Sequence, residues 1–136
     1  MKVPAIAQRS SFWSAAFAIW FLVLWQLSSN PLPGPRLESD FPIDKILHFG
    51  YFFGGGGLLS AALFLKKSRP LTGSSLHLAV VLTLFLTGAL DEWHQSWDPH
   101  RSGNDAGDLT FDILGALAGT VVFRRLQPAI FPRPTL

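Results

Sequence analysis

The chain has 136 residues, of which 49% are hydrophobic and only 15% charged, with a formal net charge of +2 and a mean hydropathy of +0.31. This length fits one domain, and so apolar a composition favours a membrane bundle over a soluble fold. There is no cysteine, which excludes a disulfide framework, a thiolate metal site and a cysteine nucleophile. The basic excess lies beside apolar runs, so it indicates membrane orientation and no nucleic-acid partner.

The first apolar run predicts a membrane-spanning helix at about 11–28. It carries no charged side chain and is long enough to cross a hydrocarbon core of ~30 Å. The aromatic residues at 12–20 and Trp25 near the far end are typical of interfacial anchors. A cleaved signal peptide is the alternative. Because no clean Ala-x-Ala site follows, a retained span is favoured.

Three further apolar runs predict spans at about 44–65, 75–92 and 108–126, with Gln127-Pro128 marking the end of the last. The connection before the second span is rich in proline and glycine, and the connection between the second and third spans is basic. The predicted fold is therefore all-α, a small four-helix transmembrane bundle that forms a single membrane domain over 1–136.

Glycines recur at helix–helix spacing in two of these spans. Four consecutive glycines occupy 54–57, and Gly115 and Gly119 stand four residues apart. Small residues at this spacing let membrane helices approach closely, so we expect Gly54, Gly57, Gly115 and Gly119 to line helix contacts. A broken second helix is the alternative interpretation of the glycine run.

The distribution of charge predicts the orientation. With four spans and a cytoplasmic N-terminus, eight of the eleven Lys and Arg residues lie inside, and all nine Asp and Glu residues lie on the outer half. Basic residues accumulate on the cytoplasmic side of membranes. The sequence therefore predicts a multi-pass protein of the cell inner (plasma) membrane with both termini cytoplasmic.

Ionisable residues gather at the predicted outer face. Six of the nine acidic residues and two of the four histidines lie between Asp91 and Asp112. Residues four apart share a helix face, and His48 and Asp112 would each lie about 6 Å below the acidic residue one turn earlier. An ionisable group at that depth marks a functional site by default, so we expect a polar pocket here. The pairs at this spacing are Asp44 with His48, Asp91 with Gln95, and Asp108 with Asp112.

The expected pocket holds five carboxylates and, from Lys45 and Arg101, two fixed cations. Carboxylates this crowded must share protons, pair with those cations or bind another cation. Carboxylate with imidazole is a ligand set that many divalent metals accept, so a divalent cation is a candidate cofactor, although no ligand motif identifies a metal. The structural alternative is a set of helix caps and salt bridges that holds the four helices together.

Two motifs resemble the VanZ-like family of small bacterial integral membrane proteins, over about residues 40–125. The resemblance implies a membrane protein of the cell envelope. The family is named for a protein associated with resistance to glycopeptide antibiotics, teicoplanin in particular, and no settled activity comes with it. The family's Pro-Gly-Arg has His100 in place of glycine here. The motifs are Asp44-Lys45-x-x-His48-Phe49 with Tyr51-Phe52, and Asp91-Glu92-x-His94-Gln95 followed by Pro99-x-Arg101-Ser102-Gly103 and Asp108-x-x-x-Asp112-x-x-Gly115-Ala116-x-x-Gly119.

Three functions fit these residues. The first is an enzyme or binding protein that acts on a lipid head group or a lipid-linked cell-wall precursor at the outer leaflet. The second is a non-catalytic scaffold or partner-binding protein whose polar cluster is structural. The third is a proton or ion relay, which is weakened because the cytoplasmic half of the spans carries no acidic residue.

The candidate roles follow from residue chemistry. Glutamate and histidine can be tuned by burial to act as general acid or base near neutral pH. Cationic side chains would hold the anionic part of a substrate, and neighbouring carboxylates would orient the histidine or carry a cation. The candidate catalytic residues are Glu92, His48 and Asp112, and the candidate substrate-binding residues are Lys45, His94, Gln95, Arg101, Asp108 and Asp44.

Overall fold

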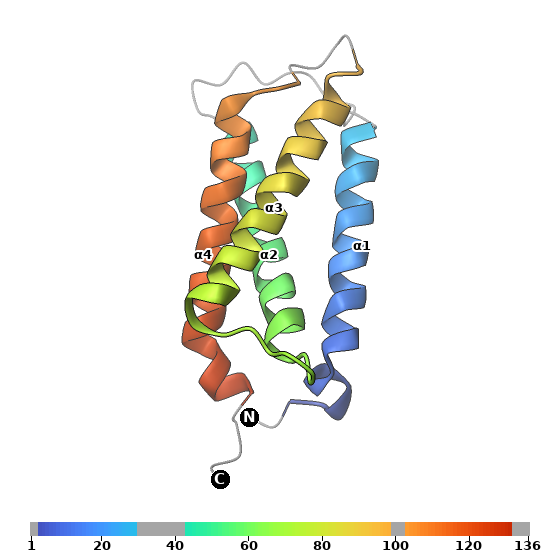
Figure 1. Ribbon diagram of the computed structural model, residues 1–136. Helices are drawn as coiled ribbons and strands as arrows, with labels where there is room; N and C mark the ends of the chain where they lie inside the picture. The colour runs from blue at the N-terminus through green and yellow to red at the C-terminus, as the bar shows by residue number, and fades with distance from the viewer. Residues whose placement is uncertain (1–2, 30–42, 99–102, 132–136) are drawn as a thin grey trace.

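The computed structural model describes residues 3–29, 43–98 and 103–131. Four long helices stand side by side and alternate in direction (Figure 1). Each is long and apolar enough to cross a membrane. The predicted all-α transmembrane bundle is confirmed. The elements are a short 3₁₀ helix, η1 (Ala5–Gln8), and the α-helices α1 (Ser10–Ser29), α2 (Ile43–Phe64), α3 (Gly73–Gln95) and α4 (Ala106–Ile130).

The bundle has two chemically different ends. At the acidic end, uppermost in Figure 1, α1 and α3 finish and α2 and α4 begin. At the basic end, α4 carries Arg124 and Arg125, and the turn between α2 and α3 carries Lys66 and Lys67. The start of α1 and the end of α4 meet at the basic end, where the ring of Trp13 lies 6.1 Å from that of Phe131. Both ends of the described chain therefore lie on one side, as four spans require.

The closest helix pair is α2 with α4, and glycine makes the approach possible. A Cβ atom at Gly115 would collide with the carbonyl oxygen of Phe49, and one at Gly119 with that of Phe53. The two glycines thus let α4 pack directly on the backbone of α2, which is the usual consequence of this spacing in membranes. The prediction that Gly115 and Gly119 line a helix contact is confirmed.

The prediction for the glycines of α2 was wrong in its choice of face. Gly54 is exposed, and a Cβ there would meet nothing within 4 Å. The contacts are made instead by Gly55, where a Cβ would come within 2.6 Å of the Trp20 ring, and by Gly56, within 2.6 Å of the carbonyl oxygen of Ala116. Gly57 contributes only its backbone to the contact with α4. One residue along a helix turns the face by about 100°, so a run of four glycines does not by itself show which face is packed.

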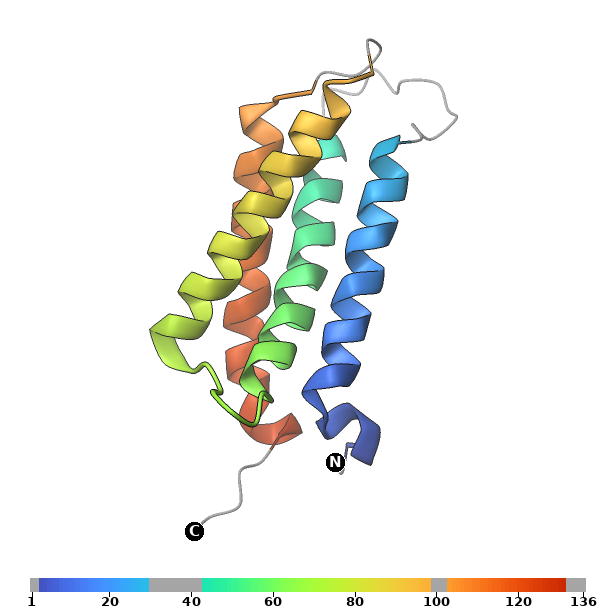
Figure 2. The ribbon, with the colours of Figure 1, turned by 45° about the vertical axis from the view of Figure 1, so that its right-hand side comes forward.

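Helix α1 is attached to α2 by a reciprocal pair of hydrogen bonds. Trp20 Nε1 donates to the carbonyl oxygen of Tyr51 at 3.1 Å, and the Tyr51 hydroxyl donates to the carbonyl oxygen of Trp20 at 2.7 Å. Their rings stack with centroids 5.0 Å apart. Helix α3 leans across the bundle, so that it is close to α1 at the acidic end and farther away at the basic end (Figure 2). Polar residues of α1 can therefore reach α3 only near the acidic end.

Helix α4 continues past its predicted end at about 126. Pro128 lies inside the helix, which ends at Ile130. Proline lacks an N–H group and normally ends a helix within a turn. Here the following Phe131 is only 8% exposed, and its N–H group donates to the carbonyl oxygen of Gln127 at 2.7 Å. Packing of this terminal ring holds the last turn, which is a tertiary effect that the local sequence does not show.

Candidate functional site

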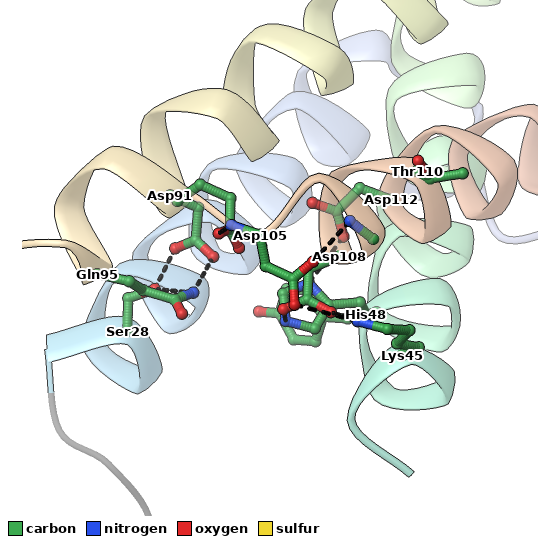
Figure 3. A network of polar contacts seen from close by, with 12 residues as sticks. Ser28, Lys45, His48, Asp91, Gln95, Asp105, Asp108, Thr110 and Asp112 are labelled. Carbon is green, nitrogen blue, oxygen red and sulfur yellow. Dashed lines mark hydrogen bonds and ion pairs between the residues drawn. The ribbon is translucent and has the colours of Figure 1, made fainter. Parts of the chain in front are cut away.

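All four helices contribute polar side chains at the acidic end, and these form one cluster (Figure 3). Six of its members are buried inside the bundle although the surrounding helices are apolar. Buried polar groups are costly in a membrane unless they are paired, so their partners decide what the cluster can do. We call the following residues the polar cluster: Ser28, Asp44, Lys45, His48, Asp91, Glu92, Gln95, Asp105, Asp108 and Asp112.

The deepest contact joins α2 to α4. His48 Nδ1 donates to Asp112 Oδ1 at 3.0 Å, and the Asp112 side chain is 0% exposed. The other ring nitrogen of His48, Nε2, lies 3.9 Å from Asp108 Oδ2, which is too long for a hydrogen bond. Asp112 therefore orients the imidazole, and Nε2 makes no hydrogen bond within the described part of the chain.

Asp112 fits into the bundle because α3 carries a glycine opposite it. A Cβ atom at Gly88 would lie 2.6 Å from Asp112 Oδ2. That oxygen has no hydrogen-bond partner among the described residues, and it is buried. The carboxylate is thus paired through one oxygen only, and its second oxygen faces the backbone of α3.

Lys45 connects the start of α2 to the start of α4. Its Nζ atom lies 2.9 Å from Asp108 Oδ1 and 3.2 Å from Asp105 Oδ2. Asp105 is also the N-cap of α4, because its Oδ1 atom accepts a hydrogen bond from the Gly107 N–H group at 2.6 Å. These two interactions, the cap first and the lysine second, hold the pKa of the Asp105 carboxyl below its usual range.

A second group joins α1 to α3. Asp91 accepts hydrogen bonds from the Ser28 hydroxyl and from Gln95 Nε2, the latter at 2.7 Å. Gln95 Nε2 also lies 3.4 Å from the Ser28 hydroxyl oxygen. All three residues are buried. Among the described residues, each side chain of this group finds a partner within the three.

Glu92 lies between the two groups. Its Oε2 atom accepts a hydrogen bond from the Asp105 N–H group at 2.7 Å, and its carboxylate is near enough to Asp108 and His48 to interact electrostatically with both. Glu92 is 4% exposed, and its Oε1 atom is buried without a partner among the described residues. A buried carboxylate oxygen that lacks a donor is costly, so Glu92, like Asp112, has an unmet demand for a cation or an N–H donor.

Three side chains could hold a metal ion. One ligand atom each from Asp44, His48 and Asp108 lies within 4.8 Å of the others. Oxygen ligands with one imidazole suit several divalent metals, and metal-binding histidines usually donate their other ring N–H group to a carboxylate, as His48 does to Asp112. The geometry of these three side chains is compatible with the divalent cation that the sequence suggested as a candidate cofactor. It does not favour one metal over another.

The remaining predicted residues lie in different places. His94 is stacked on Trp25, with ring centroids 3.9 Å apart, and packs edge-on against Trp97 at 5.1 Å. It therefore belongs to an aromatic group of α1 and α3, away from His48. Gln95 belongs to the group around Asp91, to which it donates a hydrogen bond. Arg101, predicted to hold an anionic substrate, lies outside the described residues.

Sequence reasoning missed three contributors to the cluster. Asp105 could have been found, because an aspartate just before an apolar helix is a common N-cap. Ser28 could not have been found, because the two serines at the end of this apolar span carry no pattern that distinguishes one from the other. Gly88 could not either, since its role depends on Asp112 lying opposite it on another helix.

A protein-family model matches most of this chain. The family model described as VanZ/LLP1 matches residues 3–127, which includes α1 and is wider than the 40–125 suggested by the motifs. Comparisons with curated proteins and with solved structures found no match. The family match covers most of the 136 residues and contains the whole polar cluster. This four-helix membrane protein therefore belongs to the VanZ/LLP1 family.

Proposed function

We propose that the acidic end of this membrane protein binds a lipid head group or a lipid-linked cell-envelope precursor through the polar cluster. The observation that carries this proposal is the unpartnered Oε1 atom of Glu92, buried between helices that lie in a membrane. An ammonium or amide N–H group of a head group would supply the missing donor. A lipid is the ligand class that reaches such a position by diffusion within the bilayer.

The charge of the cluster decides how a head group would be held. The carboxylates of the cluster outnumber its cations, so the cluster favours direct binding of a positively charged amino group. A phosphate would need Lys45, whose Nζ atom lies at the cluster's partly exposed rim, or a divalent cation held by Asp44, His48 and Asp108. If a reaction follows binding, Glu92 or His48 supplies the general base or acid, and Asp112 keeps the imidazole in position.

A scaffold is the second candidate, and the Asp91 group favours it. Ser28, Asp91 and Gln95 satisfy one another and tie α1 to α3 without any need for a ligand. If Glu92 belonged to the same purely structural network, removal of its charge would disturb the bundle. If it belongs to a binding site, removal of its charge would disturb only the ligand.

We expect Glu92→Gln to keep the fold and to lose the ligand. The glutamine oxygen can still accept the bond from the Asp105 N–H group, and the amide NH₂ replaces the oxygen that has no partner. Thermal stability in detergent should therefore be unchanged or slightly higher. The amount of host lipid that co-purifies per mole of protein, measured by mass spectrometry, should fall by about tenfold for the lipid class bound, because a charge-assisted bond is lost.

The matched control is Thr110→Val, at the same end of the bundle. The Thr110 hydroxyl is exposed and bonds only to the carbonyl oxygen of Ala106 in its own helix, so lipid content should match the wild type. If Glu92→Gln unfolds the protein, the scaffold interpretation is correct. If the lipid content is equal in all three proteins, the binding proposal is wrong.

We further propose that the acidic end faces outward and that both termini are cytoplasmic in the plasma membrane. The support is the separation of basic and acidic residues to opposite ends of the bundle. Fusions to an exported phosphatase should be active after Arg36 or Gly103 and inactive after Arg69 or Leu136. Phosphatase activity in the Arg69 fusion would reverse the orientation.

A further inference from the structure

A groove opens between α3 and α4 at the basic end, far from the polar cluster. Its volume is about 580 Å³, which is within the range of small-ligand sites. The first turn of α3 and the last turns of α4 border it here. The groove is lined by Phe64, Thr72, Gly73, Leu76, Phe123, Arg124, Gln127 and Pro128.

The groove has an apolar floor and a polar rim. Phe64, Leu76 and Phe123 are each less than 10% exposed and belong to the hydrophobic core. Arg124 and Gln127 lie on the last turns of α4, and Thr72 lies at the start of α3. A ligand that fits must therefore be amphipathic, with an apolar part against the three core residues and a polar part at the rim.

The start of α3 contributes positive potential to the rim. Thr72 is the N-cap of α3, but its side chain makes no capping hydrogen bond, and Gly73 follows with a φ of 58°. The first N–H groups of a helix have no partner within the helix, and they carry the positive end of its dipole. Thr72 and Gly73, at this helix start, line the same groove as Arg124.

Arg124 lies beside His77 of α3. Its Nη1 atom is 3.0 Å from His77 Nδ1, which can accept this hydrogen bond only in the tautomer that does not donate to the Gly73 carbonyl oxygen. A second, smaller groove of about 270 Å³ is lined by His77, Val121, Arg124 and Arg125 and is therefore also bordered by this contact. Arg124 thus lines both grooves, and its guanidinium has further N–H groups that can donate hydrogen bonds to an anion.

The charged side chains around the groove have one sign. Every Asp and Glu that the structure describes lies in the acidic half of the bundle, and Asp108 is separated from Arg124 by about 24 Å of helix. That distance approaches the ~30 Å thickness of the hydrocarbon core, so Arg124 lies at the opposite membrane interface. Basic pockets between membrane helices at such an interface suit anionic lipid head groups.

We propose that this groove binds the phosphate of an anionic phospholipid, with Arg124 and the start of α3 as the anion site. The glycerol and the first carbons of the acyl chains would lie against Phe64, Leu76 and Phe123. The site is independent of the polar cluster and of the ligand proposed there, because no residue is shared between them.

Binding is tested on the purified full-length protein in detergent by native mass spectrometry. The two probes are dioleoylphosphatidylglycerol and dioleoylphosphatidylcholine, which have the same acyl chains. We expect a preference of about tenfold for phosphatidylglycerol, and a loss of that preference in Arg124→Gln, because a charge-assisted interaction is removed. Inorganic phosphate should not compete at the same concentration, because it lacks the apolar part.

Two further variants separate a site from general surface charge. Lys67→Gln removes one positive charge from the same end without touching the groove. The lipid preference of this variant should stay within about twofold of the wild-type preference, because a screened surface charge has only a small effect. Thr72→Phe fills the rim and leaves every charge in place, and it should lose the preference as Arg124→Gln does. Equal losses in Lys67→Gln and Arg124→Gln, or no preference in the wild type, would overturn the proposal. If Arg124→Gln does not fold, the Thr72→Phe result decides.

Discussion

Replacement of Gly115 by leucine should lower the free energy of unfolding by about 3 kcal/mol, since the extra atoms cannot be accommodated. A Cβ atom at this position already collides with the carbonyl oxygen of Phe49. A backbone atom in the middle of α2 cannot move aside as a flexible side chain would. The helices must therefore separate along their closest contact, which would also weaken the packing of Gly119 on Phe53.

The matched control for this change lies two residues away. Leu117 is 42% exposed, so it faces lipid, and Leu117→Ala should cost less than about 1 kcal/mol. Both variants can be compared by unfolding in mixed detergent micelles containing increasing sodium dodecyl sulfate. Similar stability of the two variants would show that close contact of α2 with α4 does not hold the bundle together.

The second large effect is expected at the pair of His48 and Asp112. His48→Leu leaves a carboxylate that is 0% exposed with no partner on either oxygen. Removal of one partner from a buried ion pair costs about 3 kcal/mol or more. Asp112→Leu should cost less, because His48 is partly exposed and can still approach Asp108, 3.9 Å away.

A double-mutant cycle tests whether the two residues act as a pair. The variant with both changes should be more stable than His48→Leu alone, because the unpaired carboxylate is gone. Thr110→Val is the control at the same helix end: its hydroxyl is exposed and bonds to the Ala106 carbonyl oxygen of its own helix, so its loss should cost less than about 1 kcal/mol. Strict additivity of His48→Leu and Asp112→Leu would mean that their hydrogen bond contributes nothing to stability.

Much of the architecture could be predicted from periodicity and charge. Long apolar runs predicted four spans, and the i, i+4 spacing of Asp44 with His48 and of Asp108 with Asp112 placed each pair on one helix face. Helical rise then placed His48 and Asp112 at similar depths, and the structure brings them to 3.0 Å. These inferences hold because the spacing and rise of residues along a helix depend only on the local backbone. In addition, each span has to cross the membrane from one face to the other.

The sequence alone determined which side chains share a face of each helix and at which depth they lie; the rotation of one helix against another was decided only by the tertiary structure. That rotation directs Gly55 and Gly56 to the packed side, which Gly54 does not reach, and brings Ser28 to Asp91. It also places His94 against Trp25 and separates the Asp91 group from the His48 group. The physical reason is that contacts between helices depend on side-chain shapes on both partners at once, and no single segment of sequence contains both.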